Sequence, residues 1–203
     1  MSQFETVLFD IGGVVLTNGW DTRERAELLA RYGLDREAFE ARHKEIYPAW
    51  DTGAITAGTY LDTTIFYEPR GFSRGEFFEE ICALSKPLED GALGIVAEVA
   101  ASNSYLVGAL NNESRETNAY RFETFGLRRY FKVALSSCYL GLRKPDAAIY
   151  QRALEILGNR PERILFIDDH AENVATAAEV GMRALLFVGA GQLRQDLVEL
   201  GVL

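Results

Sequence analysis

The sequence predicts an α/β protein with a doubly wound, Rossmann-like parallel sheet and an all-helical subdomain inserted after the first strand. Two observations support this prediction. Short apolar runs that end in polar residues alternate with helical patterns along the chain, which is typical of doubly wound sheets. A long stretch between the first and second runs contains helical patterns alone. We therefore expect a sheet domain that is interrupted by one helical insertion.

Five short apolar runs are the candidate strands, because each could be buried on both faces of a parallel sheet. They are Val7–Phe9, Tyr105–Leu110, Val133–Leu135, Ile164–Ile167 and Ala184–Val188. The helical patterns between the later runs are Arg115–Phe125, Ala147–Leu157 and Ala171–Val180. Asp146 is a candidate N-cap for the second of these helices, and Gly181 is a candidate end for the third.

The interval from Thr17 to Asp90 predicts the inserted subdomain, because a parallel crossover needs only about a dozen residues. Its four amphipathic patterns are Thr22–Tyr32, Arg36–Ile46, Thr56–Phe66 and Ser73–Leu84, the last opened by a capping box. We expect its aromatic residues to form its own core and His43 to lie on a solvated face. We assign residues 1–16 and 91–203 to the sheet domain and residues 17–90 to the insertion.

The composition argues against several classes of partner. The chain has 203 residues and a net charge of −9, from 21 basic and 30 acidic residues. Such a surface repels nucleic acid and anionic membranes, so we expect neither as a partner. No leader or membrane-spanning stretch is recognisable, which favours a cytoplasmic location, where Cys82 and Cys138 are expected to be free thiols. The oligomeric state is not indicated.

Polar residues follow the apolar runs at the positions where ligands bind in open α/β sheets. Asp10 follows the first run, Asn111 and Asn112 follow the second, and Asp168 and Asp169 follow the fourth. Lys144 precedes a helix in the segment Gly-Leu-Arg-Lys-Pro-Asp, and we expect Arg143 beside it to be solvated. Magnesium prefers carboxylate oxygens together with phosphate oxygens and waters. The set therefore predicts a site for magnesium and a phosphoryl group, in which a carboxylate can form an aspartyl-phosphate.

These residues stand in four segments that resemble the haloacid dehalogenase superfamily of hydrolases, with a helical cap inserted after the first strand. The resemblance covers essentially the whole chain. Within that superfamily, the run Gly12-Gly13-Val14 resembles the branch that contains sugar-phosphate phosphatases and the phosphatase domain of epoxide hydrolases. The segments are Val7–Val15, Leu110–Asn112, Arg143–Asp146 and Phe166–Asp169 followed by Asn173.

The resemblance implies a magnesium-dependent hydrolase of small phosphorylated metabolites, with a sugar phosphate as one option. Asp10 would be the nucleophile and a magnesium ligand, together with the carbonyl of Gly12 and either Asp168 or Asp169. Lys144 would bridge the nucleophile and the phosphoryl group, and Asn111 would stand where the family usually has Ser or Thr. Asn112 and the backbone of Gly12 and Gly13 would contact the substrate.

Gly12 departs from the family, because most phosphatases in it carry an aspartate there as general acid and base. General acid–base catalysis contributes about 10²–10⁴-fold, and the nearest ionisable substitutes in sequence are Glu113 and His170. Two alternatives therefore stay open. One is a haloacid dehalogenase that needs no metal, and the other is a catalytically weakened protein that binds a phosphorylated metabolite or a partner.

Overall fold

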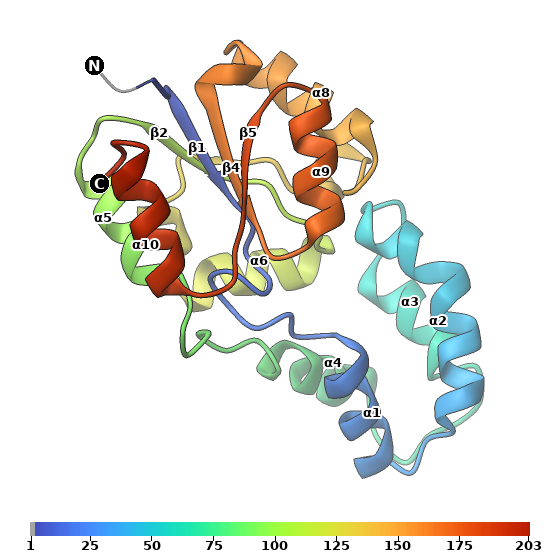
Figure 1. The fold of residues 1–203 in the computed structure, drawn as a ribbon. Coiled ribbons are helices and arrows are strands. Elements are labelled where there is room, and N and C mark those ends of the chain that lie inside the picture. The colour runs from blue at the N-terminus through green and yellow to red at the C-terminus, as the bar shows by residue number, and fades with distance from the viewer. Residues whose placement is uncertain (1–2) are drawn as a thin grey trace.

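The computed structural model describes residues 3–203 and contains a five-stranded parallel sheet in the order β3-β2-β1-β4-β5 (Figure 1). The fold class predicted from the sequence is confirmed. The observed strands match the predicted runs to within two residues at each end. They are β1 (Thr6–Phe9), β2 (Leu106–Ala109), β3 (Val133–Ala134), β4 (Ile164–Asp168) and β5 (Arg183–Leu186).

Helices cover both faces of the sheet, which explains why its central strands are apolar without alternation. Val7 and Phe9 of β1 belong to one core, and Leu8 between them belongs to the core on the opposite face. The first core is covered by α5 (Leu93–Ala101), α6 (Arg115–Thr124) and α10 (Ala190–Glu199). The second is covered by α8 (Ala147–Leu157) and α9 (Ala171–Glu179), on the other side of the sheet in Figure 1.

The register of the sheet brings the predicted site residues to one edge. Phe9 at the end of β1 is paired with Ala109 of β2 and with Ile167 of β4. The residues that follow these three positions therefore lie side by side at the carboxyl ends of the strands. They include Asp10 and Asp168.

The four helices of the insertion have a hydrophobic core of their own, apart from the two cores of the sheet. They are α1 (Thr22–Arg31), α2 (Arg36–Asp51), α3 (Ala57–Thr64) and α4 (Arg74–Ala83). Side chains cap all four N-termini, and the predicted capping box of Ser73 and Glu76 is present in α4. The exact division at residues 17 and 90 stays a prediction.

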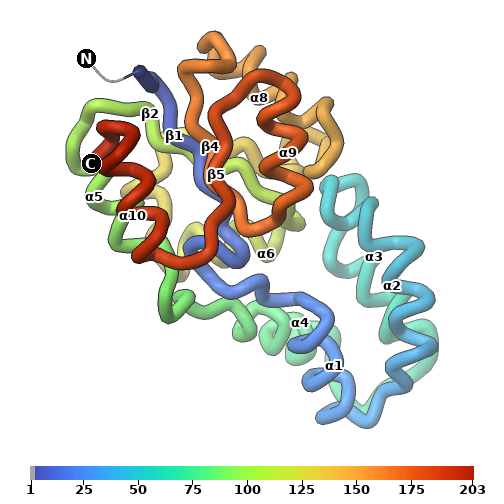
Figure 2. The backbone as a smooth tube through the Cα atoms, in the orientation of Figure 1, coloured from blue at the N-terminus to red at the C-terminus, as the bar shows by residue number. Residues whose placement is uncertain are grey.

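The two segments that join the insertion to the sheet domain run next to each other (Figure 2). The backbone N–H of Thr17 donates to the carbonyl of Lys86, and Leu16 forms an antiparallel bridge with Pro87. Thr17 also donates its hydroxyl to the carbonyl of Leu84. The chain therefore enters and leaves the insertion at one point.

The structure differs from the predicted helices in one helix end and in several elements that were not predicted. α2 continues past the predicted end at Ile46 and through Pro48, because Trp50 in its last turn stacks on Tyr60 at 4.1 Å between ring centroids. Helices α5 and α10 were not predicted, and neither has a side-chain hydrogen bond at its N-cap to mark where it begins. The short segments α7 (Ser137–Leu140), η1 (Leu127–Arg129) and η2 (Pro161–Arg163) were also missed.

The expectation that His43 is solvated is wrong. His43 is buried inside the insertion, where its Nδ1 lies 2.7 Å from the hydroxyl of Tyr60. That hydroxyl also accepts a hydrogen bond from Nε1 of Trp20. Burial, reinforced by Arg25, lowers the pKa of His43 to about 4. The charged neighbours Arg42 and Lys44 gave no signal of this, because His43 packs against Phe39 and Tyr47 of its own helix and against Tyr60 of α3.

Candidate active site

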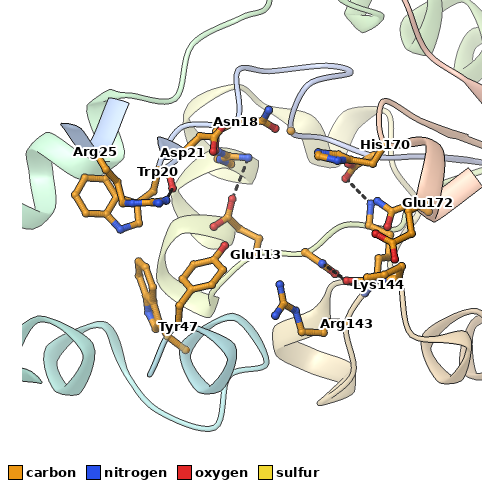
Figure 3. Close-up of a pocket in the computed structure, with 17 residues that line it drawn as sticks. Asn18, Trp20, Asp21, Arg25, Tyr47, Glu113, Arg143, Lys144, His170 and Glu172 are labelled. Atoms are coloured by element: carbon orange, nitrogen blue, oxygen red, sulfur yellow. Dashed lines mark hydrogen bonds and ion pairs between the residues drawn. The ribbon is translucent and has the colours of Figure 1, made fainter. Parts of the chain in front are cut away.

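A cavity of about 380 Å³ lies between the carboxyl edge of the sheet and the insertion (Figure 3). One end is lined by polar residues of the sheet domain, Asp10, Asn112, Lys144 and Asn173 among them. The other end is lined by aromatic residues of the insertion, which are Trp20, Tyr47 and Trp50. These three aromatic side chains serve both the core of the insertion and the wall of the cavity. The sequence favours a place in the core for them, and the structure gives them both places.

Asp10 lies directly after β1, at the polar end of the cavity. Its Oδ1 accepts a hydrogen bond from the N–H of Ile11 at 2.7 Å and lies 3.0 Å from Nζ of Lys144. Burial raises the pKa of Asp10 to about 7; Lys144 opposes this rise, and Asp168 and Asp169 add to it. A buried carboxylate among other carboxylates is therefore held in place by one ammonium group.

Lys144 lies between two carboxylates, with only 1% of its side chain exposed. Its Nζ donates to Oδ2 of Asp168 at 2.5 Å, besides its contact with Asp10. Burial by itself lowers the pKa of Lys144, but the two carboxylates outweigh burial and raise it. Asn112 fixes the lysine backbone, since its Oδ1 accepts from the Lys144 N–H and its Nδ2 donates to the Lys144 carbonyl, both at 2.8 Å.

The two aspartates after β4 have different surroundings. Oδ1 of Asp168 accepts hydrogen bonds from the His170 N–H and from Nδ2 of Asn173, so both oxygens of Asp168 have partners. Oδ1 of Asp169 is buried and has no hydrogen-bond partner. Burial raises the pKa of Asp169, and Asp168 contributes to the rise.

Three carboxylates at this edge could hold a divalent cation. Asp10, Asp168 and Asp169 each offer one oxygen, and these oxygens lie within 4.8 Å of one another. The Asp169 carboxylate lies against Gly13, where a Cβ atom would come within 2.0 Å of its Oδ2. Gly13 has a φ of +72°, which also favours glycine. The unpartnered oxygen and the close approach fit a magnesium ion with oxygen ligands.

The side chain of Asn111 is not among those that line the cavity. Its Nδ2 donates to Asn118 at 3.1 Å, and its Oδ1 accepts from the hydroxyl of Ser136 at 2.8 Å. The side-chain amide predicted to contact the phosphoryl group is thus occupied inside the sheet domain. Asn112 does line the cavity, although its amide is occupied by the backbone of Lys144.

The space next to Gly12, where the family aspartate would project, is filled by other side chains. A Cβ atom on Gly12 would lie 2.7 Å from Oδ1 of Asn18 and 3.6 Å from Nη1 of Arg121. Asn18 and Arg121 both line the cavity, and neither is among the residues predicted from the sequence. An isolated asparagine or arginine carries no motif, so no sequence signal could have found them.

Glu113 and His170, the two substitutes considered for the missing acid, both line the cavity. Glu113 is 13% exposed and forms an ion pair with Arg121 at 2.9 Å. It also accepts a hydrogen bond from the hydroxyl of Thr117 at 2.5 Å. His170 is 65% exposed, and its Nε2 lies 3.7 Å from Oδ2 of Asp169. Glu113 is therefore fixed inside the cavity, whereas His170 lies at its outer side.

Arg143 was expected to be solvated, but its side chain is only partly exposed. It lines the cavity, with its guanidinium group above the ring of Tyr47, and its Nε lies 3.2 Å from Oδ2 of Asp51. Asp51 is fully buried at the end of α2, and burial raises its pKa to about 7 although Arg143 opposes the rise. This pair connects the insertion to the loop that carries Lys144. The pairing could not be predicted from the sequence, because Asp51 and Arg143 lie far apart along the chain.

Comparisons with known proteins agree with this geometry. The family model of haloacid dehalogenase-like hydrolases matches residues 4–181. Flavin mononucleotide hydrolase 1 of Arabidopsis thaliana is 29% identical over 97% of this chain and 77% of its own length. Phosphatase MT3486 of Mycobacterium tuberculosis is 29% identical over 95% of this chain and 91% of its own length.

Solved structures show the same fold. The magnesium complex of the HAD family enzyme bt-2542 from Bacteroides thetaiotaomicron superposes with a TM-score of 0.80 at 21% identity. The superposition covers 97% of this chain and 98% of that one. Among residues 3–203, no helix combines the length and the apolar character needed to cross a membrane.

Proposed function

Because this chain belongs to the haloacid dehalogenase-like hydrolases, we propose that it is a magnesium-dependent phosphatase of small phosphorylated metabolites, with Asp10 as the nucleophile. One observation carries the proposal: Lys144 is buried between Asp10 and Asp168, while a neighbouring oxygen of Asp169 is buried without a partner. The names of the relatives from Arabidopsis thaliana and Mycobacterium tuberculosis support a phosphatase activity.

Asp10 and Asp169, with the carbonyl of Gly12, would hold the magnesium ion. We assign the direct contact to Asp169 rather than Asp168, because both oxygens of Asp168 are already hydrogen bonded to protein groups. Asp168 would then position Lys144. When bound, the ion would neutralise phosphoryl oxygens and so reduce their repulsion from the carboxylates.

The reaction would proceed in two displacements at Asp10. In the first, a carboxylate oxygen of Asp10 forms a bond to phosphorus, the ester P–O bond breaks, and the leaving alcohol takes up a proton. In the second, a water oxygen forms a bond to phosphorus, the water gives up a proton, and the bond between phosphorus and the Asp10 oxygen breaks, which releases inorganic phosphate and restores the carboxylate. Lys144 would stabilise the charge on the phosphoryl oxygens in both steps.

The leaving group needs a proton that residue 12 cannot supply. Of the two substitutes, His170 suits this task better, because Glu113 is ion paired with Arg121 and so has no proton to give. We propose that turnover is favoured by esters with good leaving groups, because Asn18 occupies the space of the missing acid. We also propose a cytoplasmic location, in keeping with two buried cysteines that are free rather than paired.

Phosphate release tests the proposal directly. Wild-type protein and Asp10→Asn would be incubated with p-nitrophenyl phosphate and a panel of sugar phosphates and flavin mononucleotide, with magnesium or with EDTA. We expect release that requires magnesium and is lost in the variant. Halide release from 2-haloacids in the same assay, without phosphate release, would favour the dehalogenase instead. Binding of the esters with neither product would favour the metabolite-binding protein.

A further inference from the structure

The cavity beyond the phosphate end contains a fixed carboxylate. Glu113 follows Asn112 directly, so it stands next to the residues proposed to bind the phosphoryl group. Figure 3 shows it in the middle of the cavity, close to Tyr47 and with Lys144 and His170 on the far side. The ion pair with Arg121 and the hydrogen bond from Thr117 hold it there. A leaving group that extends from the phosphate toward the aromatic end must pass this carboxylate.

The positive charges of the cavity are already matched by carboxylates. Among the described residues that line it, each lysine and arginine has an acidic partner. The pairs are Lys144 with Asp10 and Asp168, Arg121 with Glu113, Arg143 with Asp51, and Arg25 with Glu40. A second anionic group on the substrate would therefore meet Glu113 without gaining a free cation in exchange.

We infer that the cavity selects phosphate monoesters whose leaving group is uncharged, and that Glu113 rejects those with a second anionic group. This inference rests on the proposed function and deepens it. The carboxylate would accept a hydrogen bond from a hydroxyl or ring N–H of the leaving group, and Trp20, Tyr47 and Trp50 would contact its apolar part. A like charge placed against Glu113 would lower affinity, which is how an interface or pocket excludes a wrong partner.

Two matched pairs of substrates test the inference. Glucose 1-phosphate is compared with glucuronic acid 1-phosphate, and phenyl phosphate with 4-carboxyphenyl phosphate, since each pair differs by a carboxylate remote from the phosphate. For the wild-type enzyme with magnesium, we expect kcat/KM to be about tenfold or more lower for the carboxylate member of each pair. In Glu113→Gln the kcat/KM values of the two members of each pair should differ by no more than about threefold. Glu123→Gln makes the same charge change on an exposed part of α6 and should keep the wild-type ratio.

Two further measurements keep the inference testable if a variant folds poorly or no ester is hydrolysed. Glu113→Gln/Arg121→Met removes both charges of the pair, and so leaves no buried arginine unpaired. Thermal shifts of Asp10→Asn with the same four esters and magnesium report binding without turnover, and the uncharged members should raise the melting temperature more. If no phosphate is released but the thermal shifts still differ between the two members of each pair, the proposed function is overturned and the selectivity is not. Equal values within each pair, or a preference that persists without Glu113, would overturn the inference.

Discussion

Lys144 shows how strongly this site depends on a single charge. Its ammonium group is the cation that contacts both Asp10 and Asp168, and all three side chains are almost inaccessible to water. Removing one member of such a buried group leaves the others without compensation, which costs more than the group contributes as a whole. The same residue is therefore expected to matter for stability and for catalysis.

Lys144→Met is expected to lower the free energy of unfolding by about 3–5 kcal/mol, because two buried carboxylates lose their partner. Phosphate release should fall by about 10²–10³-fold or more, since the charge on the phosphoryl oxygens is no longer stabilised. Urea unfolding and a phosphate assay measure the two effects. Lys144→Met/Asp168→Asn should recover part of the stability and none of the activity. Wild-type stability in the single variant would contradict the role given to the pair.

Gly13 offers a second test at this scale, with a matched control elsewhere in the chain. In Gly13→Ala the new Cβ atom would collide with the Asp169 carboxylate, so we expect magnesium to bind at least about tenfold more weakly. Gly33→Ala has the same left-handed backbone, with a φ of +62°, but no atom within 4 Å of the new Cβ. It should lose about 1–2 kcal/mol of stability and keep its affinity. Calorimetric titration with magnesium separates the two outcomes, and equal affinities would exclude Gly13 as a support for the site.

The residues proposed to bear the chemistry could be picked out from the sequence, whereas their contacts could not. Asp10, Lys144, Asp168 and Asp169 could be found because each ends a strand or opens a loop at the edge where parallel sheets bind ligands. The direction of the Asn111 amide could not be predicted, because its partners Ser136 and Asn118 come from separate segments. The same reason hid the pairing of Asp51 with Arg143.

Among the elements, the interface of α2 and α3 holds the most unusual group. Burial lowers the pKa of His43 there to about 4, and its Nδ1 is hydrogen bonded to the hydroxyl of Tyr60. The folded protein therefore binds a proton at this site less readily than the unfolded chain, whose histidine has a pKa of about 6.5. Between pH 6.5 and 4 the unfolded chain takes up more protons, so this group makes stability fall as the pH falls.

This effect can be isolated by comparing wild-type protein with His43→Gln. We expect the free energy of unfolding of the wild type to drop by up to about 3 kcal/mol more than that of the variant between pH 7 and pH 4. Above pH 7 the difference between the two proteins should be constant. Urea unfolding at a series of pH values provides the measurement. Parallel curves across the whole range would mean that His43 is not held neutral by its burial.

Helices were predictable where both the apolar spacing and a capping residue were present. α8 and the four helices of the insertion begin within one residue of their predicted starts, and Asp146 and Ser73 cap their helices as predicted. α5 and α10 lack such a cap, and their sequences alone did not separate them from loops. Tertiary packing against the sheet stabilises them instead.

At the scale of the whole molecule, one side chain of the sheet domain binds both segments that lead to the insertion. Arg121 donates from Nη2 to the carbonyl of Asn18 at 2.8 Å and from Nε to the hydroxyl of Ser85 at 3.0 Å. Its third contact is the ion pair with Glu113 inside the cavity. The position of the insertion is thus connected to the lining of the cavity through a single buried guanidinium group.

Arg121→Met should loosen this connection. We expect faster amide hydrogen exchange in residues 17–19 and 84–86, and a loss of about 2–4 kcal/mol in the free energy of unfolding because the partly buried Glu113 loses its partner. Exchange within β1 and β4 should change only in proportion to the global stability. Mass spectrometry of exchanged peptides gives both quantities. Unchanged exchange in the two segments would show that other contacts hold the insertion in place.

Because the two connecting segments are adjacent, the insertion could be exchanged as one unit. Because Thr17 and Lys86 are hydrogen bonded to each other, the intervening helices could be replaced by those of another protein without rethreading the sheet. Such chimaeras would keep the bond-breaking residues of the sheet edge, while the transplanted helices would bring their own preference for the leaving group. Evolution and protein engineering could therefore change what this enzyme accepts without altering how it cleaves.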